Sequence, residues 1–429
     1  MEPFSVVEHE DFLNMVTRLA PTKTPLTRRA LMERIAARSD KTKQRLLDEL
    51  GRAEHIAITA DCWKSFNRAF LGVTALWLDS LTLVRKTAAL CCRRERGSMT
   101  YEKIAEELEE VFLDYKVHSK VVKVITDNGS NFLKAFRVYD QHDEESEKLD
   151  IVDLASVLEN VQPFRFPPHQ RCAAHTLNLV ASVDAQRADH DKDYRTLSQS
   201  VFGKCQSLWT KQNQSTLVAD EIHDLCGRYL VVPNATRWNS RYDAMRCLQG
   251  ILEEKPQKLE ELCLRLKLPI LRRPIEADFI SEYCEVMKPI ANALDILQAD
   301  DKMYLGYLLP TITATRRRLA ALFGLQYCRP LKSAITDGIE KRFAGAMDDT
   351  ALVISAALIP RFKLQWVPEA DRDRVIQLLK TEVSRLPRRE HHVTSDPPAT
   401  GEPEDFFSFN EEGHCRRDSE AQDVMLYLQ

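Results

Sequence analysis

The stretch HIAITAD, His55–Asp61, is a short run of apolar and β-branched residues that ends on a carboxylate. Two further runs with strong strand propensity follow it, FLGVTALWL at Phe70–Leu78 and the segment Leu81–Cys92, with an Asp-Ser turn between them. Short connections join neighbouring strands in an antiparallel order, so these three runs predict an antiparallel meander. We place the end of the first strand at Asp61.

The hydrophobic period then changes to that of a helix. Thr100 is a candidate N-cap, and apolar residues recur after it at helical spacing, at Ile104, Leu108, Val111 and Tyr115. A second short run, VVKVITD at Val121–Asp127, again ends on a carboxylate and precedes a predicted helix that carries Phe132 and Phe136. A fifth strand is predicted within Pro163–Cys172.

This order of elements is that of the RNase H-like fold, in which the fourth strand lies beside the first. We therefore predict an α/β RNase H-like core with a mixed five-stranded sheet. Asp61 and Asp127 would be neighbours in that sheet, where two carboxylates can hold Mg²⁺ or Mn²⁺ for phosphodiester chemistry. The alternative is that both are ordinary strand-end residues, since Asp is common where a strand meets a turn.

Strand signals nearly vanish beyond Ala173, and the chain is predicted to be helix-dominated overall. Prolines are expected to end or bend these helices, at Pro233, Pro256, Pro269, Pro274 and Pro289. Pro310 lies inside a helical pattern, Leu305–Leu322, and predicts a kink or a break there.

The predicted domains follow this division. They are an N-terminal helical segment (1–54), the RNase H-like core (55–172), a large all-α insertion (173–345), a helical continuation towards the core (346–386), and a proline-rich flexible linker with a truncated C-terminal segment (387–429).

Composition sets limits on the class of protein. The 429 residues carry a net charge of −4 and are 44% hydrophobic, which argues against binding nucleic acid by bulk charge alone but leaves room for a local basic face. The 11 cysteines form no Cys-x-x-Cys pair, which favours reduced thiols. With no signal peptide and no apolar run of about 18 residues, we expect an intracellular protein without a membrane span.

Five blocks occur in one order along the chain, and together they resemble the hAT-superfamily transposases and their relatives with a BED-type zinc finger. The blocks are TADCW (59–63), VTALWLD (73–79), TDNGSNF (126–132), RCAAHTLNL (171–179) and ATRWNS (235–240). The resemblance continues through MYLGYLLP (303–310) and FKLQW (362–366), so it covers nearly all of the chain.

The resemblance implies roles for the two carboxylates and for the Arg-Trp block. Asp61 and Asp127 correspond to the first two carboxylates of an Asp-Asp-Glu triad that binds Mg²⁺ or Mn²⁺ for DNA cleavage and strand transfer. Trp238 corresponds to a tryptophan that stacks on a base displaced from the duplex, and Arg237 beside it could pair with a phosphate. Trp238 could equally be a core residue of the helical insertion.

Cys172 and His175 correspond to a Cys-x-x-His block of the same family. A single pair of this kind, without a second pair at finger spacing, does not predict a zinc site. We therefore expect His175 to pack near the catalytic end of the sheet or to make a structural hydrogen bond.

Three departures from the family pattern limit the functional prediction. The block that carries the third carboxylate, the C-terminal dimerisation block and the N-terminal BED finger are not found in the sequence. The sequence therefore predicts a transposase-derived nuclear protein, with the cytoplasm as an alternative location. It would be an interaction module for DNA or protein, without cleavage and strand-transfer activity. The alternative is an incomplete chain of an active hAT DNA transposase. Any DNA binding is expected to be weak or non-specific, and self-association stays open.

Overall fold

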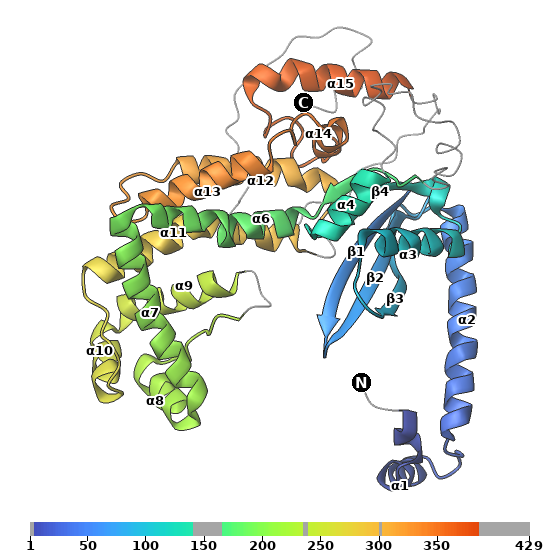
Figure 1. Cartoon of the computed structure of the whole chain (residues 1–429), viewed down its shortest axis with the longest axis horizontal. Helices are drawn as coiled ribbons and strands as arrows, with labels where there is room; N and C mark the ends of the chain where they lie inside the picture. Colours follow the sequence, from blue (N-terminus) through green and yellow to red (C-terminus); the bar gives the residue numbers. More distant parts are fainter. Residues whose placement is uncertain (1–3, 140–164, 235–238, 300–302, 386–429) are drawn as a thin grey trace. The chain divides into compact units, whose positions relative to one another are not determined.

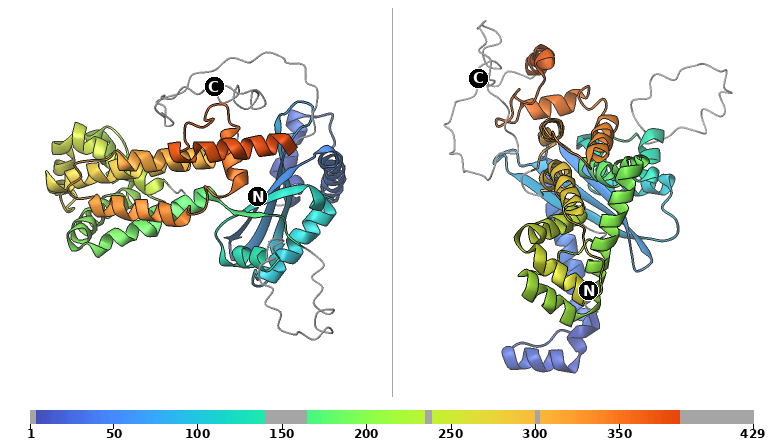
Figure 2. Two further views of the ribbon diagram at one scale, coloured as in Figure 1. Left: turned by 90° about the horizontal axis from the view of Figure 1, so that it is seen from above. Right: turned by 90° about the vertical axis from the view of Figure 1, so that its left-hand side faces the viewer.

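The computed structural model describes residues 4–139, 165–234, 239–299 and 303–385. Contacts divide the chain into two compact units, Met1–Cys172 and Ala173–Gln429, and each is described by itself. Figures 1 and 2 show the helices and strands of both units, coloured along the sequence.

The first unit is built on one five-stranded sheet of order β3-β2-β1-β4-β5 (Figure 1). Its strands are β1 Ile56–Ser65, β2 Arg68–Leu78, β3 Arg85–Glu95, β4 Val121–Thr126 and β5 His169–Arg171. β2 is antiparallel to both of its neighbours, β1 and β3, whereas β4 is parallel to both β1 and β5. The predicted mixed five-stranded sheet, with its fourth strand beside the first, is confirmed.

The predicted end of the first strand at Asp61 is wrong. β1 continues to Ser65 and forms a hairpin with β2, in which Trp63 is paired with Phe70. The two residues of the turn, Phe66 and Asn67, have φ values of 47° and 59°, as a tight two-residue hairpin turn of the type I′ class requires. Asp61 therefore lies within a strand and not at its end.

The third strand begins later than predicted, at Arg85 instead of Leu81. The intervening loop is organised by Asp79, whose Oδ1 accepts hydrogen bonds from the amides of Leu81 and Thr82 at 3.1 and 3.0 Å. A side chain that bonds to backbone amides just ahead of it favours a turn over an extended strand.

The core of the first unit lies between one face of the sheet and the helices α3 Tyr101–Asp114 and α4 Ser130–Val138, which lie beside the blue strands in Figure 2. Alternate residues of β1 are buried, as a strand with one covered face requires, and α3 and α4 contribute aromatic rings. This core includes Ile56, Ile58, Ala60, Phe112, Phe132, Phe136 and Phe166. Thr100 caps α3 as predicted, because its side chain accepts from the amide of Lys103.

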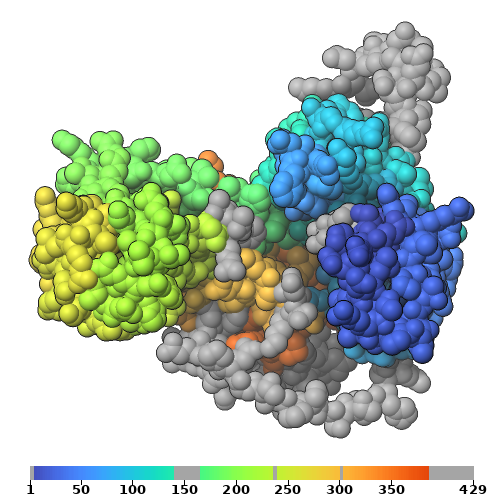
Figure 3. Space-filling view, turned by 90° about the horizontal axis from the view of Figure 1, so that it is seen from below, coloured from blue at the N-terminus to red at the C-terminus, as the bar shows by residue number. Residues whose placement is uncertain are grey.

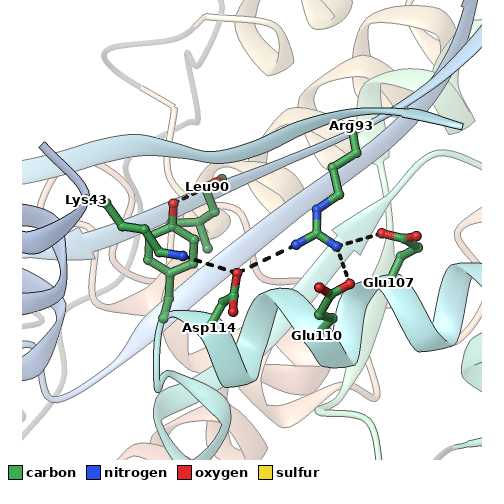
Figure 4. A network of polar contacts seen from close by, with 7 residues as sticks. Lys43, Leu90, Arg93, Glu107, Glu110 and Asp114 are labelled. Carbon is green, nitrogen blue, oxygen red and sulfur yellow. Dashed lines mark hydrogen bonds and ion pairs between the residues drawn. The ribbon is translucent and has the colours of Figure 1, made fainter. Parts of the chain in front are cut away.

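Arg93 of β3 forms ion pairs with carboxylates of α3 and so links the sheet to this helix (Figure 4). Its Nη1 is 2.8 Å from a carboxylate oxygen of Glu107 and 2.5 Å from one of Glu110, and its Nη2 is 3.6 Å from Asp114. Lys43 of α2 reaches the same oxygen of Asp114 at 3.2 Å. Burial alone would lower the pKa of Arg93, but the hydrogen bonds to Glu107 and Glu110 raise it, so the guanidinium stays charged.

Two helices and a short 3-10 turn precede the sheet. They are η1 Phe4–Glu8, α1 Glu10–Leu19 and α2 Arg28–Arg52. A second 3-10 turn, η2 His118–Lys120, lies later in the chain and directly precedes β4. Thr27 caps α2, and Lys120 donates from its Nζ to the carbonyls of Leu50 and Gly51 at 3.0 and 2.6 Å. These bonds satisfy carbonyls at the C-terminal end of α2.

Every described element of the second unit is a helix. They are α6 Ala173–Ser182, η3 Asp184–His190, α7 Lys192–Gln214, α8 Thr216–Cys226, α9 Ser240–Glu254, α10 Pro256–Arg265, α11 Ile275–Leu297, η4 Leu305–Tyr307, α12 Leu308–Ala320, α13 Arg329–Arg342, α14 Thr350–Ala357, η5 Glu369–Asp371 and α15 Arg372–Arg385. None of the described helices is long and apolar enough to cross a membrane.

Two of the prolines that were predicted to interrupt helices lie inside them. α11 does not end at Pro289, which lies inside it. The helical pattern Leu305–Leu322 is divided into the 3-10 turn η4 and the helix α12, and Pro310 is the third residue of α12, in the first turn, where a backbone amide has no acceptor within the helix. The predicted linker at 387–429 lies outside the described residues.

Candidate functional site

The register of the sheet brings the two predicted carboxylates to adjacent positions. Ala60 of β1 is paired in parallel with Thr126 of β4, and each of these residues is followed by an aspartate. Neighbouring strands lie about 4.8 Å apart, so Asp61 and Asp127 start from neighbouring points of the backbone. Asp61 is exposed and Asp127 is half-buried.

The loop that follows β4 is fixed around Asp127. The Oδ1 of Asp127 accepts a hydrogen bond from the amide of Gly129 at 2.9 Å. A Cβ at Gly129 would lie 2.9 Å from the same oxygen, so a larger residue here would displace this carboxylate from its present position.

Thr126 and β5 hold the same turn from the other side. The hydroxyl of Thr126 donates to the Asp127 carbonyl, and its oxygen lies 2.9 Å from Nε2 of His169. The His169 ring is stacked on Phe136, with centroids 4.2 Å apart, and the amide of Cys172 donates to the Thr126 carbonyl at 2.7 Å. These bonds fix the backbone from which Asp127 projects.

Cys62 lies within electrostatic reach of both carboxylates. Burial raises the pKa of its thiol to about 12, and the charges of Asp127, Asp61 and Glu95 contribute to that rise in this order. A thiolate at this place would be repelled by all three carboxylates, so the thiol stays protonated at neutral pH.

Glu95 is the carboxylate near Cys62 that the sequence did not single out. Its side chain is 5% exposed, and its Oε2 is 2.6 Å from Nζ of Lys103, which also donates to the Arg96 carbonyl at 2.9 Å. Its charge is thus compensated by a lysine. Among the residues that the structure describes, no group of three or more His, Cys, Asp or Glu side chains could hold a metal ion.

Asp61 and Asp127 nevertheless offer the ligand type that Mg²⁺ and Mn²⁺ prefer, which is carboxylate oxygen. Asp61 is exposed, and Asp127 uses Oδ1 for the Gly129 amide, so among the contacts of the described residues its Oδ2 is left for a cation. These residues fit one divalent ion with several water ligands better than a closed cage made only of protein groups.

The other predicted site residues are divided between the units. Cys172 is the last residue of the first unit, and His175 belongs to α6 in the second; both are half-buried. Arg237 and Trp238 lie outside the described residues. The residues that flank them are anchored, since Ser240 donates to the Asn234 carbonyl at 2.6 Å and Asn239 donates to the Ala291 carbonyl at 3.0 Å.

The second unit also contains a pocket of about 330 Å³. Its walls come from α6, α9 and α11, with Asn178, Asn239, Tyr242, Tyr283 and Met287 among the lining residues. No sequence pattern predicts this pocket, because its lining residues come from segments far apart in the chain.

Comparison with known proteins identifies relatives. No protein-family model matches the chain. A Zea mays protein named "Putative AC transposase" is 25% identical over 390 residues, which cover 84% of this chain and 43% of that protein. A second maize protein, "Putative AC9 transposase", is 25% identical over 256 residues, which cover 57% of this chain and 28% of that protein.

A fungal protein is also similar. The "Putative transcriptional regulator tpeD" of Talaromyces stipitatus is 24% identical over 181 residues, which cover 41% of this chain and 20% of that protein. The chain thus spans less than half the length of the curated relatives that it matches.

Proposed function

We propose that this chain, a relative of the hAT-like transposases, is a transposase-derived nuclear protein that binds DNA and does not cleave it by itself. The observation that carries the proposal is the parallel pairing of β1 with β4, which brings Asp61 and Asp127 together in the context of these relatives.

The sheet order supports an RNase H-like core in the first unit. Three antiparallel strands, followed by a fourth and a fifth that are both parallel to the first, form the order expected for that fold. The helices from Ala173 onwards would then be the all-α insertion, and its Arg237 and Trp238 would contact a phosphate and an extrahelical base. Cys172 supports the core through its bond to Thr126, and we assign His175 a structural role without zinc.

Asp61 and Asp127 would together hold one Mg²⁺ or Mn²⁺. When bound, such an ion supplies positive charge that orients and neutralises DNA phosphates. The carboxylate of Asp127 is positioned for this role by the Gly129 amide, and Asp61 is open to the solvent from which DNA arrives.

The proposed lack of cleavage rests on the described carboxylates. Two-metal phosphodiester chemistry needs enough oxygen ligands to hold both ions in fixed positions. The third carboxylate that acts on Cys62, Glu95, is buried and paired with Lys103, so it does not offer a free ligand.

An incubation of the purified chain with Mn²⁺ and labelled duplex or hairpin DNA tests this proposal. We expect binding that weakens as salt rises, and no cleavage products on a denaturing gel. Cleavage that is lost in Asp127→Ala and kept in the exposed control Asp48→Ala would instead support an active transposase. Failure to bind any DNA at low salt would contradict the proposed function altogether.

A further inference from the structure

The hairpin end of β1 and β2 carries a surface that the proposed function does not yet use. Beyond Asp61 the two strands continue to the turn at Phe66 and Asn67, and the side chain of Phe66 is 96% exposed. Figure 3 views the molecule from below, and atoms of the light-blue segment that includes this hairpin lie at its visible surface.

An aromatic platform lies on one face of this hairpin. The rings of Trp63 and Phe70 are stacked, with centroids 5.6 Å apart and planes 16° from parallel. Gly72 makes this possible, because a Cβ there would lie 2.8 Å from the Trp63 ring. Trp63 is thus held flat in one position while 40% of it stays exposed, which is what a ring that stacks on a base requires.

Phe66 adds a second argument that this end of the sheet has a role besides folding. A bulky residue with a positive φ is strained, and glycine or asparagine would make the turn at lower cost. Strain of this kind persists where a side chain serves a function. Phe66 is also nearly free of packing, so its ring contributes little to the stability of the unit.

Basic side chains flank the aromatic platform. Strand pairing brings Arg94 opposite Phe70 and Arg68 opposite Ser65, and alternation along the strands puts both arginines on the face that carries Trp63. Arg68, Arg94 and Lys64 are exposed, and no described carboxylate forms an ion pair with any of them. Arg68 and Arg94 could therefore accept phosphates without first losing an acidic partner.

The same face continues to Asp61, which lies two residues before Trp63. A strand that lies along the hairpin with a base on Trp63 would therefore pass close to the carboxylate pair. Charge and aromatic character both match a nucleic-acid strand with unpaired bases, because stacked bases in a duplex do not offer their faces to a side chain.

We propose that the β1–β2 hairpin is a binding surface for single-stranded DNA, in which Trp63 stacks on a base and Arg68 and Arg94 contact phosphates. This inference rests on the proposed function and names the surface and the form of DNA that it would use. The negative charge of Asp61 repels the phosphates of the DNA strand unless a divalent cation or a substitution neutralises that charge.

Fluorescence anisotropy with a labelled single-stranded oligothymidylate of about 20 nucleotides, measured over a salt series, tests the inference. Trp63→Ala should weaken binding by about 5- to 160-fold, since stacking contributes about 1 to 3 kcal/mol per base, whereas Trp63→Phe should keep most of the affinity. Arg68→Ala and Arg94→Ala should each reduce the salt slope by about 0.7.

Two variants probe the geometry. Gly72→Ala should weaken binding without removing a ring or a charge, because the new methyl displaces the Trp63 ring. Asp61→Asn should tighten binding in the absence of divalent ions. Arg45→Ala removes the same charge from an exposed arginine of α2 that forms no ion pair with a described residue, and it should leave the affinity unchanged.

The outcomes separate the two proposals. If the wild-type chain binds no DNA at all, the proposed function fails and the inference fails with it. If it binds single-stranded DNA, and folded Trp63→Ala, Arg68→Ala and Arg94→Ala bind as tightly as Arg45→Ala, only the hairpin inference is overturned. A dimer in sedimentation that Trp63→Ala dissociates, with unchanged DNA affinity, would also overturn it by showing that this face is an interface between two copies of the chain.

Discussion

Neutralising Asp127 is expected to make the Cys62 thiol more reactive. The thiol lies beside the two carboxylates that β1 and β4 bring together, and a thiolate there is disfavoured first by burial and then by the charge of Asp127. Asp127→Asn removes the larger of the two aspartate contributions, and Asp61→Asn removes the smaller. The thiol thus reports whether the two aspartates lie where the sheet register puts them.

The size of the effect follows from the pKa of Cys62. A rise from 9.0 to about 12 lowers the thiolate fraction at pH 8 by roughly a thousandfold. Part of this loss is offset because nucleophilicity rises with pKa, with a Brønsted coefficient of about 0.4 to 0.5, so alkylation should be about 30- to 60-fold slower than for an ordinary thiol. Asp127→Asn should recover part of that factor, and more of it than Asp61→Asn.

Alkylation by iodoacetamide at pH 8, followed by mass spectrometry, measures this rate for one cysteine. Trypsin releases Cys62 in the peptide Ala53–Lys64, which contains no other cysteine. The matched control is Asp48→Asn on α2, which removes the same charge from a residue that does not act on Cys62.

Equal alkylation rates in wild type, Asp127→Asn and Asp48→Asn, with circular dichroism showing folded proteins, would refute the reasoning. Asp127 would then exert no field on Cys62, and the two aspartates could not form a common site. A faster rate in Asp48→Asn as well would show that global loosening, and not local charge, controls the thiol.

Three further predictions concern stability, measured by urea unfolding. Burial alone would raise the pKa of Glu276, but the hydrogen bonds from Lys204 and other donors lower it. The contribution of Glu276 to stability is therefore present above about pH 4.5 and is lost as the pH falls below that value. Glu276→Gln should cost about 3 to 5 kcal/mol at pH 7 and remove this part of the acid dependence. Gly306→Ala should cost about 1 to 3 kcal/mol, since its Cβ would lie 2.2 Å from the Ser355 carbonyl oxygen, whereas Gly203→Ala, with nothing within 4 Å, should not destabilise the chain. Arg93→Ala should cost about 2 kcal/mol by leaving Glu107 and Glu110 without their shared donor, and an Arg45→Ala variant that loses as much would contradict the role of this network.

The sheet could be predicted from sequence because its signals are local. HIAITAD and VVKVITD are apolar runs with a carboxylate at the end, and the order of strands and helices between them left few topologies. The hairpin beyond Asp61 could not be found in this way, since DCWKS has no simple alternation and Phe66-Asn67 is an uncommon turn pair. The Trp63–Phe70 stack joins its two strands, and the period of the sequence does not report a contact of this kind.

The two aspartates were predicted as a pair, but their surroundings were not. Glu95 belongs to β3 and Lys103 to α3, so their ion pair depends on how the helix packs on the sheet. The burial of Cys62 likewise depends on the packing of the sheet against its helices. Contacts of this kind join elements that sequence spacing treats as unrelated, and they decide the electrostatics of the site.

The measurement that tests the central claim most directly is a Mn²⁺ titration in which electron paramagnetic resonance detects the bound ion. The pairing of β1 with β4 predicts one bound Mn²⁺ per chain that is lost to the same extent in Asp61→Asn and Asp127→Asn and is kept in Asp48→Asn. If both aspartate variants bind Mn²⁺ as well as the wild-type chain does, or if the wild-type chain binds none, Asp61 and Asp127 do not form a cation site.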